Sequence, residues 1–577
     1  MKKILFLITF ISISLFCQSQ DMQHESTQLL VLSGSNNHNW QRTTPLLKNI
    51  YKGRGLFKVE ITNQPDTLIY KDFNEFDVIV SNWNSWPEKD VRWPEKVESG
   101  LLRYLEEGGG LVFFHSSTST FYTWPEFDKI STGAWVEDTW HGKNSPVKVK
   151  IENQEHPITK GLSNFYIFDE LWINAKQNDR FQVLGSAINE DALNKGYENQ
   201  PAIAVSDYGK GRIFHTLLGH DTRAMRNTGF QTLMLRGTEW AATSRVSIPI
   251  PKELQQKKTI EASEFTWLEN DSTFALLKND EVLWQFNFNT QLGKPFFHPV
   301  YVNRNRITCS SPDDHPWHLG QWFSWKYING ANYWEFFGEN YQRNELRGIT
   351  NITSVKLKRK SDYSAEIYLE IDYYPENGQT VLTEERIIQV SPPHKDGRIQ
   401  MDYNMNFEAV ADTVELNRTP PPVADGVLWG GYGGLSVRFN QDLMSERILS
   451  SGGLHYQYRG IGHQRIEGSE ELAIVNFGYE DIDDKTGNWF YMGGKGLHGN
   501  RFGTVIMISE DTKGKGEAWY SVNTPGIPFY YINPAYVYLK PQILTKGESI
   551  NLKYRILHIE GDVNNQQLNE EYKDYYE

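Results

Sequence analysis

The sequence contains almost no cysteine, with only Cys17 and Cys309 in 577 residues. Two cysteines cannot build a framework of disulfides or a cysteine-rich metal site, and Cys17 lies in a segment that we expect to be removed. The fold must therefore be held by the burial of apolar side chains. A chain of this length can achieve that burial with two or more domains.

Positive charge is also scarce, because 58 Lys and Arg stand against 72 Asp and Glu, for a formal net charge of −14 at pH 7. An acidic protein repels the phosphate backbone of nucleic acids. We therefore expect no nucleic-acid partner.

Long apolar runs are absent after the first 20 residues, so we expect no integral membrane span. Residues 1–20 place Lys2 and Lys3 before a short apolar run, which predicts a secretory signal peptide cleaved near Ser19. The sequence thus predicts an exported protein, periplasmic or secreted. Cys17 leaves open a lipid-anchored outer-membrane form, although the bulky Leu15 and Phe16 before it fit that motif poorly.

Aromatic residues are plentiful, at 14% of the chain with 18 Trp and 30 Tyr. They can simply fill large β-rich cores. They can also serve as ring platforms for sugars, because an aromatic side chain offers an apolar face beside a polar edge. Composition leaves both interpretations open.

Residues 28–243 alternate strand and helix patterns. Buried-strand patterns occupy 29–34, 76–83 and 111–115, and helix patterns occupy 43–55, 93–110 and 228–243. A hairpin-like pair surrounds residues 209–211. Strands separated by helices predict βαβ units and a parallel sheet.

The pattern changes after residue 243. Residues 244–258 contain two prolines and a polar run, which predicts a linker. Residues 260–562 hold many short runs with period-two alternation, punctuated by Gly, Asn and Asp, which is typical of an all-β antiparallel sandwich. The polar tail, 563–577, predicts a short surface helix or a frayed end.

Four ordered motifs in residues 28–243 carry a resemblance to a known family: SGSNNHNWQRTTPLL, GGGLVFFHSSTSTFYTWPEF, EHPITKGLSNFYIFDELW and YGKGRIFHTLLGHDTRAM. The segment resembles the ThuA-like (trehalose-utilisation) family. The resemblance implies an α/β flavodoxin-like fold of the class I glutamine amidotransferase type. In those amidotransferases a cysteine nucleophile occupies the place of His115, so glutaminase chemistry is not expected here. Ser116 stays open as an alternative nucleophile, without a positioned base or a glycine elbow.

Polar residues cluster at the predicted ends of these elements. We expect His115, His220 and Glu170 to be catalytic and His38, Trp40, Trp124 and Asp221 to bind substrate, with Trp83 in the same loops. The carboxyl ends of parallel strands share one edge of a sheet, so these groups can meet there. Imidazoles beside a carboxylate can move protons or bind a divalent metal, although their spacing carries no metal signature. Alternatively, the histidines cap helices and bond loop backbones.

The second half carries a further resemblance in GKPFFHPVYV (293–302), SSPDDHPWHLGQWFSWKYINGANYWEF (310–336) and INPAYVYLKPQILTKGESINLKYRILHIEGD (532–562). It resembles the PmoA-like family over roughly residues 275–562. The family's label, a methane oxygenase, does not fit a sequence without membrane spans or a copper cluster. The resemblance implies a β-sandwich of the kind that sugar mutarotases use.

The second half also holds a histidine-rich candidate site. We expect His298, His315 and His318 to converge as proton donors and acceptors, because Pro299 and Pro316 restrict the backbone. The expected substrate-binding partners are Asp313, Asp314, Trp317, Trp322 and Arg347, and further candidates are Glu385, Arg386 and Arg438. Three imidazoles can equally bind a metal. A self-satisfied His/Asp loop is the structural alternative.

Together these observations predict an exported carbohydrate-active protein, an enzyme acting on an oligosaccharide or a modified (keto-) sugar by histidine acid–base chemistry or glycoside cleavage. No pair of carboxylates suited to glycoside hydrolysis stands out. A non-catalytic glycan-binding protein and a metal-dependent hydrolase remain alternatives. A divalent metal is the only cofactor that the residues leave open.

Overall fold

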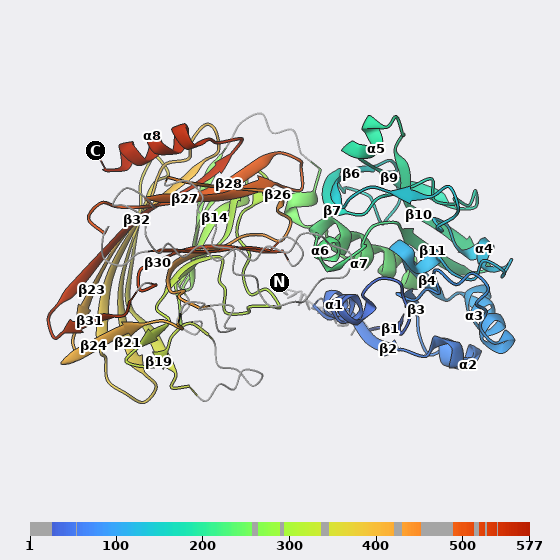
Figure 1. The fold of residues 1–577 in the computed structure, drawn as a ribbon, viewed down its shortest axis with the longest axis horizontal. Helices are drawn as coiled ribbons and strands as arrows, with labels where there is room; N and C mark the ends of the chain where they lie inside the picture. Colours follow the sequence, from blue (N-terminus) through green and yellow to red (C-terminus); the bar gives the residue numbers. More distant parts are fainter. Residues whose placement is uncertain are drawn as a thin grey trace, which may run out of the picture.

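The chain, seen in a computed structural model, consists of an α/β part and a β-rich part that lie side by side (Figure 1). The described residues are 26–576 except 54, 257–263, 289–292, 336–344, 421–429, 452–487, 513–517, 525–527 and 539. The expected signal peptide, residues 1–20, therefore lies outside the described residues. No helix in the described part of the chain has the length and apolarity that a membrane crossing requires.

The α/β part is built on one nine-stranded sheet in the order β2-β1-β3-β4-β11-β10-β9-β6-β7. Its strands are β1 (Thr27–Leu32), β2 (Phe57–Thr62), β3 (Val78–Ser81), β4 (Gly110–Phe114), β6 (Ser145–Ile151), β7 (Phe165–Asp169), β9 (Gln182–Asn189), β10 (Gln200–Tyr208) and β11 (Gly211–Thr216). The first five in this order are parallel, and β10, β9, β6 and β7 continue as an antiparallel extension. The expected parallel sheet is thus the core of a mixed one.

Helices cover both faces of this sheet. Successive residues of a strand point to opposite faces, so Leu29 packs in one apolar core and Leu30 in another. The first core includes side chains of α1 (Trp40–Lys52) and α7 (Thr228–Thr243), and the second includes those of α3 (Glu95–Glu107). The shorter helices are α2 (Tyr70–Phe73), α4 (Phe127–Ile130), α5 (Glu190–Asn194) and α6 (Thr222–Met225). The parallel core is therefore doubly wound, as the resemblance to a flavodoxin-like fold implied.

The segment after α7 packs against the α/β part. Ile248 and Leu254 are buried in the same core as α1 and α7, and a 3-10 turn forms at Lys252–Leu254. The Arg236 guanidinium donates a hydrogen bond to the Ile248 carbonyl oxygen. The described residues of the predicted linker are thus part of the packed structure instead of a free spacer.

The β-rich part is an antiparallel sandwich, as the sequence predicted. One sheet contains β12 (Phe265–Glu269), β13 (Thr273–Lys278), β14 (Glu281–Asn287), β15 (Phe296–Val302), β17 (Gln321–Ser324), β25 (Gly434–Arg438), β30 (Phe529–Ala535) and β29 (Ala518–Thr524), with β16 (Asn305–Arg306) beside β15. The other contains β20 (Gly348–Arg359), β21 (Ala365–Pro375), β22 (Leu382–Val390), β23 (Ile399–Ala409), β32 (Ser549–Glu560), β28 (Arg501–Ile508), β27 (Trp489–Lys495) and β26 (Met444–Ser450). A smaller sheet joins β19 (Ala331–Asn332), β18 (Tyr327–Ile328), β24 (Thr413–Asn417) and β31 (Gln542–Thr545).

Apolar side chains of both large sheets form one core. Along β21, for example, buried and half-buried residues alternate, which is the period-two pattern that the sequence contains. The polar tail forms α8 (Asn565–Tyr576), whose Leu568 and Tyr572 pack against Trp489 and Leu557.

Buried polar contacts join the two parts. The Arg223 guanidinium pairs with the Glu446 carboxylate, and Asp442 accepts hydrogen bonds from the Thr228 amide at 2.7 Å and the Thr228 hydroxyl at 2.6 Å. The Tyr166 amide donates to the Leu497 carbonyl oxygen at 2.7 Å, and Leu497 packs in the α/β core. These contacts involve β7, α6 and α7, which face the sandwich in Figure 1.

Candidate functional site

The parallel strands deliver several polar side chains to one edge of the sheet. His38 follows β1, Asn84 follows β3, His115 follows β4, and His220 follows β11. Because these strands are parallel, their carboxyl ends share that edge. The ring centroids of His38 and His115 lie 4.8 Å apart, and those of His38 and His220 lie 4.6 Å apart. The predicted convergence of these loops is therefore observed.

His115 is buried and adopts a backbone conformation that is unusual for a side chain with a Cβ. Its φ is +42°, in the left-handed region, directly at the end of β4. The chain thus makes a strained turn after β4 at the histidine itself, without a glycine elbow. Its Nδ1 lies 3.0 Å from the Leu217 carbonyl oxygen, and its Nε2 lies 3.2 Å from His220 Nδ1. Since a carbonyl only accepts, the proton is on Nδ1 and the Nε2 lone pair faces His220.

Glu170, which follows β7, provides the carboxylate of this cluster. Its Oε1 lies 3.4 Å from His220 Nδ1 and 3.8 Å from His115 Nε2, and it accepts a 3.0 Å hydrogen bond from Trp172 Nε1. Burial alone would raise the pKa of Glu170. The hydrogen bond and the charge of His220 lower this pKa by more than burial raises it, so it lies below its usual range. Burial in turn lowers the pKa of His220, and Glu170 more than offsets this, raising it to about 9.

An amide network holds His38 and Ser116. His38 Nδ1 lies 2.9 Å from Ser116 Oγ and 3.2 Å from Asn36 Oδ1. Asn84 Nδ2 donates to both Ser116 Oγ and Asn36 Oδ1, at 2.9 and 3.0 Å. Burial, followed by the charge of His220, lowers the pKa of His38 to about 3. The structure thus places an imidazole beside the Ser116 hydroxyl, although the surrounding amides account for the position of both groups.

Beside this cluster lies a pocket of about 180 Å³, called the tryptophan pocket below because three tryptophans are among the residues that line it. It is lined by Asn37, His38, Trp86, Ser116, Ser119, Trp135, His141, Glu170 and Trp172. The ring centroid of Trp135 lies 6.1 Å from that of Trp86 and 5.2 Å from that of Trp172. The three rings therefore form an aromatic wall over the histidines and Glu170.

The tryptophans that the sequence pointed to do not line this pocket. Trp83 and Trp124 are buried in the core beside α3, where they pack on Phe121 and Phe127. Trp40 begins α1 and is not among the lining residues. The residues that line the pocket, Trp86, Trp135 and Trp172, lie in or beside irregular loops whose patterns carried no such signal.

Asp221, also predicted to bind substrate, is instead the N-cap of α6, where its carboxylate accepts from the amides of Arg223 and Ala224. The neighbouring buried carboxylate, Asp169, accepts hydrogen bonds from the amides of Gly219 at 2.7 Å and His220 at 3.0 Å. Burial raises the pKa of Asp169 to about 7. These two carboxylates hold the backbone that carries His220.

Sequence reasoning missed His141. It lies on β5 (Trp140–His141), which pairs with β8 (Trp172–Ile173), and its Nδ1 lies 2.8 Å from the Gly142 carbonyl oxygen and 3.2 Å from Glu170 Oε2. Both neighbours only accept, so the proton is on Nδ1 and Nε2 keeps its lone pair. Its place in a short segment that also contains Trp135 and Trp140 was the only signal for it.

The second predicted cluster forms only in part. The rings of His315 and His318 stack with centroids 4.7 Å apart, and Asp314 lies 3.0 Å from His315 Nδ1. Arg438, a further candidate, donates to Asp314 at 2.8 Å and lies over the Phe529 ring. His318 is 4% exposed and is covered by Trp322 and Tyr531. Trp317 and Trp322 are buried in this aromatic cluster and offer no open face for a sugar.

Other candidates of the second half lie elsewhere. His298 is on β15, where its Nδ1 lies 2.9 Å from Thr308 Oγ1, and the ring contact that was expected for all three histidines joins only His315 and His318. Arg347 is exposed and pairs with Glu376. Arg386 pairs with Glu384 inside the sandwich, and Glu385 faces away from that core on the alternate position of β22. The catalytic and binding roles expected for this half remain predictions.

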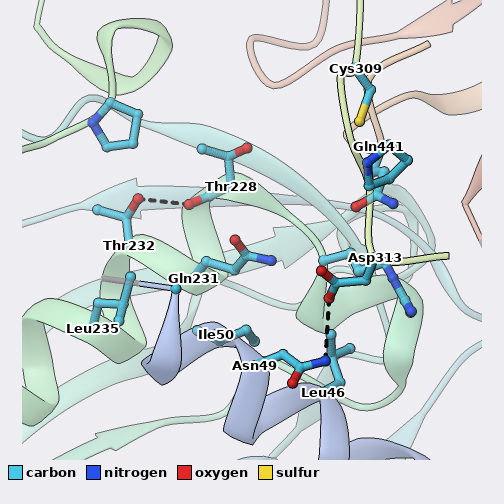
Figure 2. A pocket seen from close by; sticks show the side chains of 14 residues that line it. Leu46, Asn49, Ile50, Thr228, Gln231, Thr232, Leu235, Cys309, Asp313 and Gln441 are labelled. Atoms are coloured by element: carbon cyan, nitrogen blue, oxygen red, sulfur yellow. Dashed lines mark hydrogen bonds between the residues drawn. The ribbon is translucent and has the colours of Figure 1, made fainter. Parts of the chain in front are cut away.

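Asp313 lies at a cavity of about 280 Å³ between the two parts (Figure 2). Its carboxylate is 3.4 Å from Asn49 Nδ2 of α1. The rest of the cavity is lined mainly by α1, α7 and residues 309–313, and it lacks the histidine cluster of the tryptophan pocket. The tryptophan pocket is therefore the better candidate for chemistry.

Comparison with known proteins assigns both parts. Residues 273–573, more than half of the chain, match a family described as a family of unknown function (DUF6807). The chain belongs to the DUF6807 family. Residues 28–241 match the ThuA family, described as trehalose utilisation, so this DUF6807 protein carries an N-terminal ThuA domain. The family that matches the sandwich is DUF6807, and the PmoA-like assignment is not specifically supported.

Several solved structures are similar to this DUF6807 protein. A ThuA-like protein from Parabacteroides merdae is 30% identical, with 41% of this chain and 96% of that chain covered and a TM-score of 0.36. A ThuA-like protein from Bacteroides uniformis is 22% identical, with coverage of 38% and 93% and a TM-score of 0.30. The GH36 α-galactosidase AgaB from Geobacillus stearothermophilus is 11% identical, with coverage of 52% and 41% and a TM-score of 0.27. No curated protein matches the chain.

Proposed function

We propose that the protein is an enzyme that acts on a carbohydrate, and that the tryptophan-walled pocket of the ThuA domain is its active site. One observation carries this proposal: three imidazoles and a carboxylate meet at the base of a pocket that is lined by three indole rings and several polar side chains. Convergent polar groups in an otherwise aromatic pocket are the usual arrangement of a binding or catalytic site. The family's description, trehalose utilisation, supports a sugar as the substrate.

The pocket favours one sugar unit over a larger ligand. Its volume of about 180 Å³ is below the roughly 300–1,000 Å³ typical of pockets for drug-sized molecules. The apolar faces of Trp86, Trp135 and Trp172 suit the C–H faces of a sugar ring, and His38, Ser116 and the amide of Asn37 suit its hydroxyl groups. The rest of a disaccharide or oligosaccharide would extend from the mouth of the pocket.

The chemistry that fits best is the movement of a proton next to a carbonyl group, as in elimination or isomerisation of an oxidised (keto-) sugar. His141 lines the pocket, and its Nδ1–H is held by Gly142 and Glu170, so its Nε2 lone pair is free to accept a proton. Among the described residues that line the pocket, Glu170 is the only carboxylate. Glycoside hydrolysis by a pair of carboxylates therefore has less support here.

The remaining expectations are part of this proposal. Export to the periplasm or the medium, expected from residues 1–20, would bring the enzyme to glycans outside the cytoplasm. The DUF6807 sandwich would contribute recognition of a longer glycan, although His318, one of the histidines predicted there, is covered by Trp322 and Tyr531.

Mass spectrometry of the purified protein with disaccharides and their 3-keto derivatives tests the proposal, with two variants and one control. His141→Asn should lower kcat by about 10²–10⁴-fold with little change in KM, because Asn can donate to Glu170 but cannot accept the substrate's proton. Trp135→Ala should mainly raise KM, because it removes part of the aromatic wall. His394→Asn, at an exposed histidine of the sandwich, should leave both constants unchanged.

Two outcomes would contradict the proposal. If no sugar is converted but Trp135→Ala weakens the binding of one, the protein is a glycan-binding protein. Turnover that survives both His141→Asn and Trp135→Ala would place the active site elsewhere, and the DUF6807 domain would then be the first place to search.

A further inference from the structure

The base of the tryptophan pocket has the features of a metal site. His38, His115, Glu170 and His220 each offer one ligand atom, and these atoms all lie within 4.8 Å of one another. We infer that these four side chains bind one divalent transition-metal ion, with Zn²⁺ the best match. The inference rests on the proposed function, because it concerns the floor of the same pocket.

The distances between the ligand atoms fit a metal at their centre. The separation of His115 Nε2 and His220 Nδ1 is 3.2 Å, that of His220 Nδ1 and Glu170 Oε1 is 3.4 Å, and that of His115 Nε2 and Glu170 Oε1 is 3.8 Å. Four ligands at Zn–N and Zn–O distances of about 2.0–2.2 Å occupy the corners of a tetrahedron with edges of about 3.3–3.6 Å. The triangle of His115, His220 and Glu170 therefore needs shifts of only a few tenths of an ångström. His38, the fourth ligand, lies within 4.8 Å of the other three and must approach by up to about 1.2 Å to complete the tetrahedron.

The groups behind the ligands orient them as in known metal sites. A metal-binding histidine commonly donates its second ring N–H to a carbonyl or carboxylate, which fixes the lone pair on the metal. His115 does so through Nδ1 and the Leu217 carbonyl oxygen, at 3.0 Å. The second oxygen of Glu170 lies beside His141 Nδ1 at 3.2 Å, and Asp169 holds the His220 amide at 3.0 Å.

The types of ligand indicate which metal ion would bind, and their position indicates that the ion would be open to the pocket. Three imidazoles and one carboxylate favour zinc and neighbouring transition metals over Mg²⁺ and Ca²⁺, which prefer oxygen ligands. His38 and Glu170 line the pocket, whereas His115 is buried and absent from the lining. An ion at this place would thus face the pocket on one side and could polarise a carbonyl or hydroxyl oxygen of a bound sugar.

Metal titration of the chelator-treated full protein tests the inference. We expect one equivalent of Zn²⁺ to be retained after dialysis, as measured by inductively coupled plasma mass spectrometry, and one equivalent of Co²⁺ to give the visible absorption of low-coordinate cobalt. Excess Mg²⁺ should displace neither ion. His115→Asn and Glu170→Gln should each weaken Zn²⁺ binding by at least about 100-fold, whereas His394→Asn, at an exposed histidine, should not change it.

Circular dichroism of each variant establishes that it is folded, and the cobalt spectrum of the unaltered protein decides the question even if a variant does not fold. Absence of saturable Zn²⁺ and Co²⁺ binding, or binding that both variants retain in full, would overturn the inference. If no metal binds while sugar turnover persists, only the metal site is refuted. If metal binds as expected and no sugar is bound or converted, the metal site stands and the proposed function fails.

Discussion

The ion pair between Arg223 and Glu446 should be a major contributor to the contact between the ThuA domain and the sandwich. The side chains are 6% and 12% exposed, so both charges are largely removed from water. Glu446 also accepts a 2.6 Å hydrogen bond from the Tyr530 hydroxyl, and the Arg223 guanidinium lies 3.6 Å from the centroid of the Phe168 ring. Replacing Arg223 with Met therefore leaves a buried carboxylate with one neutral donor.

The expected magnitude follows from that burial. Removing one partner of a buried pair costs about 3–5 kcal/mol, because the remaining charge is uncompensated. Arg223→Met and Glu446→Met should each lower the free energy of unfolding by about this amount. The double variant should lose only about 1–2 kcal/mol, because it buries no charge and mainly leaves the Tyr530 hydroxyl without its acceptor.

Guanidinium denaturation followed by far-ultraviolet circular dichroism measures these changes. The free energy of unfolding is taken from the first transition, in which the contact between the two parts should break. The exposed pair Arg103–Glu107 provides the control, and its double Met variant should leave the free energy of unfolding unchanged within experimental error. Additive effects in the Arg223–Glu446 cycle, with the double variant as unstable as the sum of the single ones, would refute the reasoning.

Two further predictions concern a strained residue and a buried base. The backbone of His115 has a φ of +42°, a conformation that only glycine adopts without a steric penalty. In metal-free protein, His115→Gly should therefore be more stable than His115→Ala by about 1 kcal/mol. The opposite order of stability in thermal denaturation would contradict the observed backbone. Burial lowers the pKa of Lys294 to about 7, whereas a lysine in the unfolded chain has a pKa of about 10.4. Between about pH 7 and pH 10 this side chain is therefore protonated in the unfolded chain and mostly neutral in the folded protein. The free energy of unfolding should therefore rise with pH from about 7 to 10, by up to about 4 kcal/mol. Lys294→Met should remove this part of the rise, and identical pH profiles for the two proteins would show that the lysine is not buried as described.

The candidate site could be predicted where it depends on strand periodicity. The apolar runs before His38, His115 and His220 identify three strands, and parallel strands in a doubly wound sheet bring their carboxyl ends to one edge. Glu170 was predicted because it is a polar residue at the end of an element. It lies at the same edge of the sheet, but it follows β7, which is not one of the five parallel strands. The distances between these groups could not be predicted, because they depend on the loops.

The aromatic walls could not be predicted from local patterns. Trp83 and Trp86 are three residues apart, yet the first is buried beside α3 and the second lines the pocket. A loop has no periodicity to decide which side of a residue faces inward, so contacts with distant segments decide it. His141 reaches the pocket only because β5 pairs with β8, about 30 residues later in the chain.

By itself, the sequence determined the two fold classes, the ends of helices such as α7, and the edge of the sheet where polar groups gather. It could do so because hydrophobic period, caps and turn residues act over a few neighbouring positions. Only the tertiary structure decided that His298 lies apart from His315, that Trp317 and Trp322 are covered, and that the pocket takes its walls from Trp86, Trp135 and Trp172. These outcomes depend on packing between segments far apart in the chain, which no local pattern encodes.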